Sequence, residues 1–238
     1  LTYILNINSE EVTILKNDAG EYLLIVADGM GGHRAGEVAS SMVVTHLGKR
    51  FNDLVTVGTK YDATNWLKDN ISEINHHIVE YASNNPESKG MGTTVVVALL
   101  THDFLLYANV GDSSGFAMKN GHLLKVTKDH TLVQLLVQAG DLTEEEAKYH
   151  PKKNVLMKAL GGEEDVVPDI YEVDMSFDAI LLSSDGLTNM LSNEAIEKVL
   201  NDPELSIEDK VVKLIRKCNA RGGTDNISVA YLVKESGE

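Results

Sequence analysis

The sequence predicts an α+β fold with antiparallel sheets. Its strand candidates are short, rich in Val, Ile, Leu and Tyr, and clustered in groups, whereas its long helix candidates come in pairs. Several strand candidates are joined by tight turns such as Asn120-Gly121, and connections that short favour antiparallel pairing. The regular strand–helix alternation that predicts a parallel sheet is absent. Because no linker or repeat divides the 238 residues, a single domain over 1–238 is the simplest interpretation.

The elements follow from local patterns along the chain. Apolar runs bounded by turn residues predict strands at 2–7, 11–16, 21–27, 93–101, 103–110, 114–119, 121–127, 168–174, 178–184 and 226–234. Helices are predicted at 36–51, 62–84, 131–139, 143–149, 193–201 and 206–220. In the second helix Ile71, Ile74 and Ile78 recur near helical spacing. Thr143 and Glu146 form the capping box that opens the fourth.

Composition excludes several classes of function. The formal charge of −15 argues against a nucleic-acid partner, because such proteins need basic surface to displace counterions. No apolar run approaches the roughly 20 residues that span a bilayer, so a membrane-embedded protein is not expected. The single Cys218 rules out an intramolecular disulfide framework and a CxxC zinc site, and a buried structural thiol is the favoured interpretation. A cytoplasmic setting fits best.

Four aspartates share one context, at or next to the end of an apolar strand candidate and beside a glycine or small polar residue. They are Asp28, Asp112, Asp185 and Asp225. One such aspartate is an ordinary turn residue, because its side chain bonds nearby backbone amides. Four that converge would repel one another in a half-buried site, and a divalent cation would remove that repulsion. Hard cations such as Mg²⁺ and Mn²⁺ prefer oxygen ligands, and the HExxH or paired cysteines that indicate zinc are missing.

The glycines beside Asp28 fit such a site. Gly29 can offer its carbonyl oxygen to a metal without a side chain that obstructs a substrate, and Gly31 and Gly32 allow close backbone approach. The residues do not match the glycine-rich motifs of dinucleotide-binding or P-loop proteins. "GMGGHR" has Arg34 where a GxGxxG dinucleotide loop needs its third glycine, and it lacks the GK[ST] of a P-loop.

Five segments in order resemble the motifs of a known family. They are "DGMGGH" at 28–33, "GMGTT" at 90–94, "VGDS" at 110–113, "SSDGLT" at 183–188 and "GGTDNIS" at 222–228. The set closely resembles the metal-dependent serine/threonine protein phosphatases of type 2C, the PPM family, in their short bacterial form. The resemblance covers nearly the whole chain, and five ordered motifs are far more specific than any one of them.

The resemblance implies a four-layer α-β-β-α sandwich, with two central antiparallel sheets and a dinuclear metal centre at one end. It implies two to three Mn²⁺ or Mg²⁺ ions, with Asp28 bridging two of them and Gly29 contributing its carbonyl. Asp185 and Asp225 would complete the first metal's shell, and Asp112 would share a third, weaker metal with Asp185. A mobile flap within about 128–161 would border the substrate cleft.

The function implied is that of a Mn²⁺/Mg²⁺-dependent protein phosphatase. A hydroxide shared by two metals would attack phosphoserine or phosphothreonine directly, without a phospho-enzyme. The implied partners are phosphorylated proteins, including a membrane serine/threonine kinase and its substrates, and the enzyme would act as a monomer. His33 is one candidate for the general acid, since histidine titrates near neutral pH. A metal-bound water is another, and His33 serves equally well as a loop histidine bonded to backbone.

Three departures from the family pattern bear on function. Family members begin with a strand and a segment that carries a phosphate-binding Arg and a further metal-site Asp, whereas residues 1–4 resemble the strand after it. The substrate-binding residues are therefore left open. Ser114 stands where relatives have Arg, and Met30 where some have a histidine acid. Either the protein lacks the Arg segment or only this chain does, and the second interpretation is favoured. A protein that truly lacks it would support a second hypothesis, a catalytically impaired regulatory or binding module of the same fold, against which the intact Asp28, Asp185 and Asp225 argue.

Overall fold

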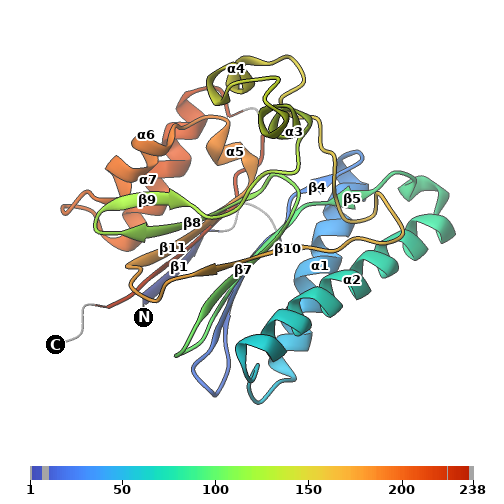
Figure 1. Ribbon diagram of the computed structural model, residues 1–238, viewed down its shortest axis with the longest axis horizontal. Coiled ribbons are helices and arrows are strands. Elements are labelled where there is room, and N and C mark those ends of the chain that lie inside the picture. The colour runs from blue at the N-terminus through green and yellow to red at the C-terminus, as the bar shows by residue number, and fades with distance from the viewer. Residues whose placement is uncertain (1, 7–10, 224, 236–238) are drawn as a thin grey trace.

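The computed structural model describes residues 2–6, 11–223 and 225–235 and has the predicted four-layer architecture (Figure 1). Two five-stranded antiparallel sheets pack face to face. The first sheet has the order β1 (Thr2–Asn6), β12 (Val229–Val233), β11 (Ala179–Ser183), β8 (Ser114–Lys119), β9 (His122–Lys125). The second has the order β10 (Asp169–Val173), β7 (Leu105–Val110), β6 (Val95–Leu100), β3 (Tyr22–Val26), β2 (Val12–Lys16).

Helices cover the outer face of each sheet (Figure 1). The second sheet is covered by α1 (His33–Asn52) and α2 (Lys60–Asn84), and the first by α6 (Asn193–Leu200) and α7 (Ile207–Ala220). At one end of the sandwich lie α3 (Leu132–Ala139) and α4 (Glu144–Tyr149), with the single turn α5 (Asp185–Thr188) beneath them. The short elements β4 (Gly29–Met30), β5 (Gly92–Thr93) and η1 (Pro86–Ser88) complete the description. None of the helices in the described ranges is long and apolar enough to cross a bilayer.

The central strands are apolar throughout because both of their faces are buried. In β3, Leu23 and Ile25 face the core under α1 and α2, while Leu24 and Val26 face the core between the sheets. Adjacent side chains of a strand point to opposite faces, so an unbroken apolar run is what a doubly covered sheet requires. β6 and β11 divide their side chains between two cores in the same way.

The covering helices are amphipathic and capped. In α7 the side chain of Ser206 accepts a hydrogen bond from the backbone N–H of Asp209 and begins the helix. Its buried side chains then recur at helical spacing and pack on the first sheet: Val211, Leu214, Ile215 and Cys218. Cys218 is a buried free thiol, as predicted. α2 begins at a capping box formed by Thr59 and Asp62.

Every predicted strand and helix is present, with ends that shift by up to three residues; residue 7 of the first predicted strand lies outside the described ranges. The largest shift at a helix start is in α1, which begins at His33 rather than at 36. The glycines of the preceding loop hide that start, because the N-cap residue Gly32, with φ at 90°, has no side chain that could supply a capping oxygen. The missed elements β4, β5 and α5 have two to four residues and are too short for a periodic pattern.

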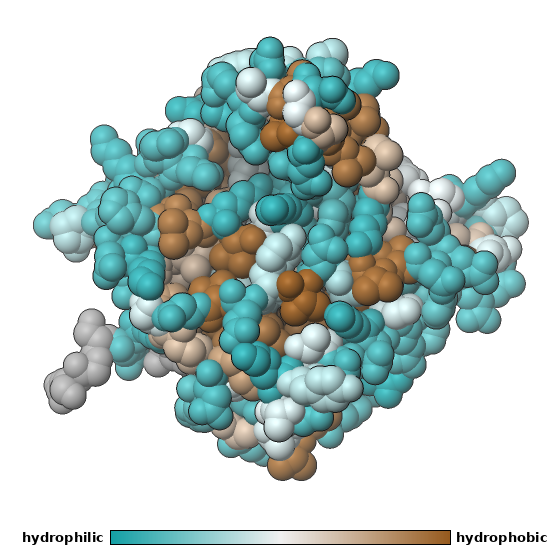
Figure 2. Space-filling view, in the orientation of Figure 1, coloured by the Kyte–Doolittle hydropathy of each residue, from teal (hydrophilic) through white to brown (hydrophobic). Residues whose placement is uncertain are grey.

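One side of the sandwich is hollowed by a groove of about 400 Å³, to which both edge strands β9 and β10 contribute residues. Its lining includes the apolar side chains of Leu124, Val126 and Phe177. Figure 2 shows apolar residues gathered on this face. The groove lies along the strands, away from the end where the four aspartates sit.

Candidate metal centre

The four aspartates lie at one end of the sandwich because of how the strands run. β3 and β7 are both antiparallel to β6, so they point the same way and end together, and Asp28 and Asp112 follow two residues after them. In the first sheet, Asp185 follows two residues after the end of β11, and Asp225 precedes the start of its antiparallel partner β12. The predicted convergence is therefore real, with two carboxylates from each sheet.

Asp28 and Asp185 form the tightest pair. Burial, followed by the charge of Asp185, raises the pKa of Asp28 to about 8, and the two carboxyl groups lie within hydrogen-bonding range of each other. Burial, followed by the charge of Asp225, also raises the pKa of Asp185. Two carboxyl groups come this close only when a proton or a cation stands between them. At neutral pH and without a cation, the pair therefore shares one proton.

Asp112 and Asp225 surround this pair. Burial, followed by the charges of Asp185 and Asp129, raises the pKa of Asp112 to about 7. Asp225 is exposed, and its Oδ1 accepts a hydrogen bond of 2.9 Å from the backbone N–H of Asn226. Three of the carboxyl groups are therefore half-buried, and that of Asp225 is exposed to solvent.

A single hydroxyl group connects the two loops of the second sheet. The backbone N–H of Asp28 donates to Thr94 Oγ1 at 3.1 Å, and the N–H of Thr94 donates to the Asp28 carbonyl at 2.9 Å. Thr94 Oγ1 lies 2.7 Å from the buried Ser113 Oγ, next to Asp112. Because Thr94 Oγ1 accepts from Asp28, its own proton is free to go to Ser113. The relative position of Asp28 and Asp112 is held by these buried contacts.

Two glycines are required by close backbone approach. A Cβ atom on Gly29 would lie 2.1 Å from the carbonyl oxygen of Gly36 in α1. A Cβ on Gly186 would lie 2.3 Å from the carbonyl oxygen of Asn226. Glycine at 29 and 186 therefore lets α1 and the 225–226 segment pack directly against the backbone that carries Asp28 and Asp185.

Glu11 is a fifth acid at this site, which the sequence analysis did not single out. It is 5% exposed, its charge raises the pKa of Asp28, and Ser40 Oγ donates to its Oε1 at 3.3 Å. The N–H of Ala27 donates to the carbonyl of Glu11 at 2.9 Å. The signal was in the hairpin register: with Val12 opposite Val26, residue 11 lies opposite residue 27, beside Asp28.

Two of the other residues singled out from sequence are placed by the structure. Met30 is 41% exposed in β4, and Ser114 is fully buried at the start of β8, where its Oγ has no hydrogen-bond partner among the described residues. His33 is the first residue of α1, but its side chain lies outside the described part of the structure, so its role as an acid stays a prediction.

A cavity of about 610 Å³ joins the aspartates to the predicted flap. Its lining includes Asp112 and Asp185 as well as Lys153 and Asn154 of the 128–161 segment. His130 ties the start of this segment to the loop before Asp112. The N–H of Gly111 donates to His130 Nδ1 at 3.0 Å, so Nε2 carries the proton and donates to Asp169 at 2.8 Å. His130 therefore has a structural role.

The donor set suits a hard divalent cation. Asp185 Oδ1 is buried, and no N–H or hydroxyl group of the described residues donates to it, although a buried carboxylate oxygen needs a proton or a cation. Within the described ranges, no three Asp, Glu, His or Cys side chains are already close enough to hold an ion by themselves. A pair of carboxyl groups with others nearby fits Mg²⁺ or Mn²⁺, which keep several waters and accept backbone carbonyls.

The chain is similar over nearly its whole length to one family of known proteins. The family model described as protein phosphatase 2C matches residues 10–227. The serine/threonine phosphatase stp of Listeria monocytogenes is 39% identical over 229 residues, which cover 96% of this chain and 90% of that protein. The structure of the S. agalactiae serine/threonine phosphatase superposes with a TM-score of 0.89 at 38% identity, with 98% of each chain covered.

The catalytic domain of the phosphatase PstP, solved in complex with two manganese ions, superposes with a TM-score of 0.81 at 32% identity. The match covers 97% of this chain and 96% of that one. A family model that spans most of the sequence, relatives of nearly equal length and the shared four-layer fold agree with one another. The chain belongs to the protein phosphatase 2C family.

Proposed function

We propose that this chain is a Mn²⁺- or Mg²⁺-dependent phosphatase of phosphoserine and phosphothreonine in proteins. Family membership makes it a phosphoprotein phosphatase, and so a hydrolase. The observation that carries the metal dependence is the half-buried pair of Asp28 and Asp185. The two carboxyl groups lie within hydrogen-bonding range of each other, and no N–H or hydroxyl group of the described residues donates to Asp185 Oδ1.

The residues that would hold the ions come from both sheets. We assign Asp28, the Gly29 carbonyl, Asp185 and Asp225 to a two-ion centre. Asp112, which lines the same cavity as Asp185, would share with it a third, weaker ion. Glu11 lies behind Asp28, where its negative charge favours cation binding at that carboxylate.

The aspartates also explain why the site needs cations to admit its substrate. A phosphate ester carries negative charge, and a cavity floored by several carboxylates repels it. Bound divalent ions neutralise the phosphoryl oxygens and supply a nucleophile from water at neutral pH. Asp28 acts by holding the ions in place. His33 remains the proposed proton donor to the leaving alcohol, with a water as the alternative.

The biological setting is part of the proposal. The substrates are phosphorylated proteins, and a membrane serine/threonine kinase together with its targets is the proposed counterpart. The relatives from Listeria monocytogenes and S. agalactiae carry serine/threonine phosphatase in their names, which supports that substrate class. We propose that the enzyme acts in the cytoplasm as a monomer, which cell fractionation and light scattering would test.

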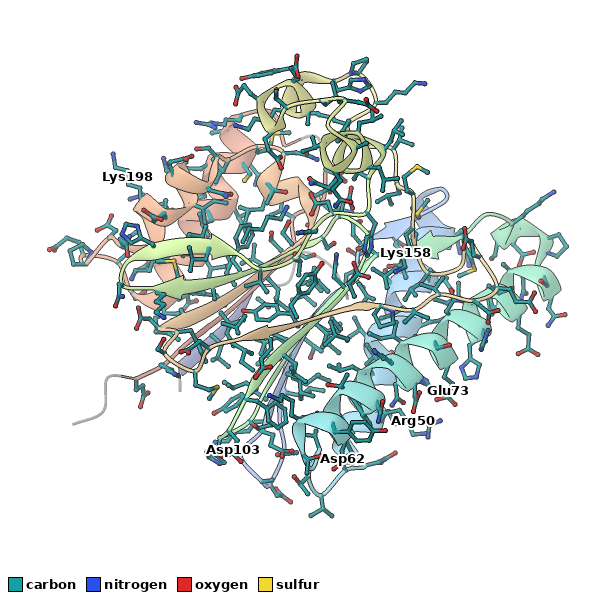
Figure 3. All side chains as sticks on the ribbon, in the orientation of Figure 1. Arg50, Asp62, Glu73, Asp103, Lys158 and Lys198 are labelled. Carbon is teal, nitrogen blue, oxygen red and sulfur yellow. The ribbon has the colours of Figure 1, made fainter. Side chains whose placement is uncertain are left out.

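Phosphate release from a phosphothreonine peptide tests the proposal. The purified chain is assayed with Mn²⁺, with Mg²⁺, with chelator, and as Asp225→Ala. We expect turnover only with metal and a loss of at least 100-fold in Asp225→Ala, because an exposed ligand is removed without disturbing the core. Asp103→Ala is the matched control, since Asp103 lies at the far end of the sheets (Figure 3).

The outcomes separate the hypotheses. Turnover that persists in chelator would overturn the metal mechanism. Mn²⁺ binding without turnover, seen by calorimetry, would favour the catalytically impaired regulatory or binding module instead. Equal losses in Asp225→Ala and Asp103→Ala would show that the effect does not arise at the carboxylate cluster.

A further inference from the structure

We propose that Asn189 is a positioning residue that selects which oxygen of Asp185 binds metal. This inference rests on the proposed function. Asn189 Nδ2 donates a hydrogen bond of 3.0 Å to Asp185 Oδ2. The other oxygen, Oδ1, is buried, and no N–H or hydroxyl group of the described residues donates to it. The two oxygens of one carboxylate therefore have opposite surroundings, one held by the protein and one available.

The orientation of the Asn189 amide follows from chemistry. An ionised carboxylate only accepts hydrogen bonds, so the amide nitrogen and not the amide oxygen must face Asp185. The nitrogen can donate but cannot bind a cation, so it competes with the metal for Oδ2 and leaves Oδ1.

The backbone holds Asn189 in this place. It lies four residues after Asp185, a spacing that brings two side chains to one face of a helical turn. The N–H of Asn189 donates to the Asp185 carbonyl at 2.8 Å, and that of Leu191 to Leu187 at 2.9 Å. The N–H of Ser184 donates to the Ser228 carbonyl at 3.0 Å, which fixes the turn to β12 at its start.

Asn189 is exposed, whereas Asp185 Oδ1 is buried. It lines the cavity that also contains Asp112 and Asp185. An exposed amide can be replaced without opening a hole in the core, so its function can be separated from folding. Partners that orient a metal ligand through a hydrogen bond ordinarily contribute about 10- to 100-fold to metal affinity.

Asn189→Leu tests the proposal, because leucine is of similar size and has no donor. Mn²⁺ binding is measured by titration calorimetry and by the electron paramagnetic resonance of free Mn²⁺. We expect the Kd to rise about 10-fold. Peptide phosphatase activity should recover when Mn²⁺ is raised by a similar factor, with KM for the peptide nearly unchanged. Asn189→Gln, which keeps an amide donor, should restore part of the affinity.

Asn193→Leu is the matched control. Asn193 is an exposed asparagine of the same cavity. Among the described residues no hydrogen bond joins it to Asp185, so its replacement should leave Mn²⁺ affinity unchanged. Thermal unfolding of each metal-free variant verifies the fold, and Asn189→Ala replaces the leucine variant if that one does not fold.

Wild-type affinity in Asn189→Leu or Asn189→Ala would overturn the proposal, as would an equal loss in Asn193→Leu. A loss that Asn189→Gln does not reduce would also count against it. These results leave the proposed function standing, because wild-type Mn²⁺ binding and turnover are intact. If the unaltered chain itself binds no Mn²⁺, the proposed function and this inference both fail.

Discussion

Two kinds of buried acid occur in this molecule, and their partners distinguish them. Glu21 is 5% exposed and accepts hydrogen bonds from Asn17 Nδ2 at 2.7 Å, Thr56 Oγ1 at 2.7 Å and the Val57 N–H at 2.9 Å. The carboxyl of Asp28 instead lies within hydrogen-bonding range of another carboxyl, that of Asp185. A buried acid satisfied by donors is structural, whereas one placed against a second acid indicates a site that awaits a cation.

This difference predicts how the metal-free protein responds to pH. The pKa of Asp28 is about 8 in the folded protein and near 3.8 as a free side chain, so the folded chain keeps a proton that the unfolded chain has lost. Unfolding then releases protons, and stability falls as pH rises between about 4 and 8. Asp112, with a pKa of about 7, acts in the same direction.

We therefore expect the melting temperature in chelator to be lower at pH 8 than at pH 5.5, and added Mn²⁺ to reverse the trend. Asp28→Asn, which cannot lose the proton, should have a shallower dependence. A metal-free melting temperature that rises over this range, or an unchanged slope in Asp28→Asn, would contradict the assignment.

At the scale of elements, the helix pair α1 and α2 is anchored at both of its ends. Near the metal centre, α1 packs backbone to backbone against Gly29. At the far end, Glu21 fastens the α1–α2 connection to the β2–β3 hairpin through Thr56 and Val57. Between these anchors, Arg50 of α1 and Glu73 of α2 form an exposed ion pair of 2.6 Å (Figure 3). An exposed pair of this kind contributes little, so the anchors matter more.

Glu21→Ala should therefore destabilise the protein by about 2–3 kcal/mol, because hydrogen bonds to a charged acceptor are lost and three donors are left without it. Chemical denaturation measures the loss. The control is Glu80→Ala, on the exposed side of α2, which should change stability by less than about 0.5 kcal/mol. Equal effects in the two variants would show that Glu21 is not an anchor.

At the scale of the whole molecule, the candidate metal centre lies where the two sheets meet. Asp28 and Asp112 extend from the second sheet, and Asp185 and Asp225 from the first. Without cations, these carboxylates repel one another across the sandwich. Bound ions would turn that repulsion into a cross-link between the sheets.

Mn²⁺ should therefore stabilise the entire fold rather than one loop. A ligand that binds only the folded state at 100 times its Kd contributes about 2.7 kcal/mol. Thermal unfolding followed by circular dichroism should show one transition that moves up with Mn²⁺. Asp225→Ala should move less, and NaCl of equal ionic strength should not reproduce the shift. A melting temperature indifferent to Mn²⁺ would argue against a site shared by both sheets.

The sequence predicted most of the architecture because most of it is recorded locally. Strands such as β3 and β11 are apolar runs that end at turns, and α7 has its buried residues at helical spacing. The short elements β4, β5 and α5 were not predicted, because they depend on contacts between distant segments. Gly29, for example, pairs with Thr93, and no local sequence pattern predicts that pairing. The single domain and the flap at 128–161 stay predictions.

The sequence by itself determined the chemistry available at the site: four aspartates at strand ends, glycines beside them, and five ordered motifs of one phosphatase family. Only the tertiary structure decided which carboxyl groups touch, that Glu11 lies behind Asp28, and that Asn189 holds one oxygen of Asp185. The physical reason is distance. Residue type is local information, whereas a contact between Asp28 and Asp185 depends on strand register and on how two sheets pack, which the whole chain sets together.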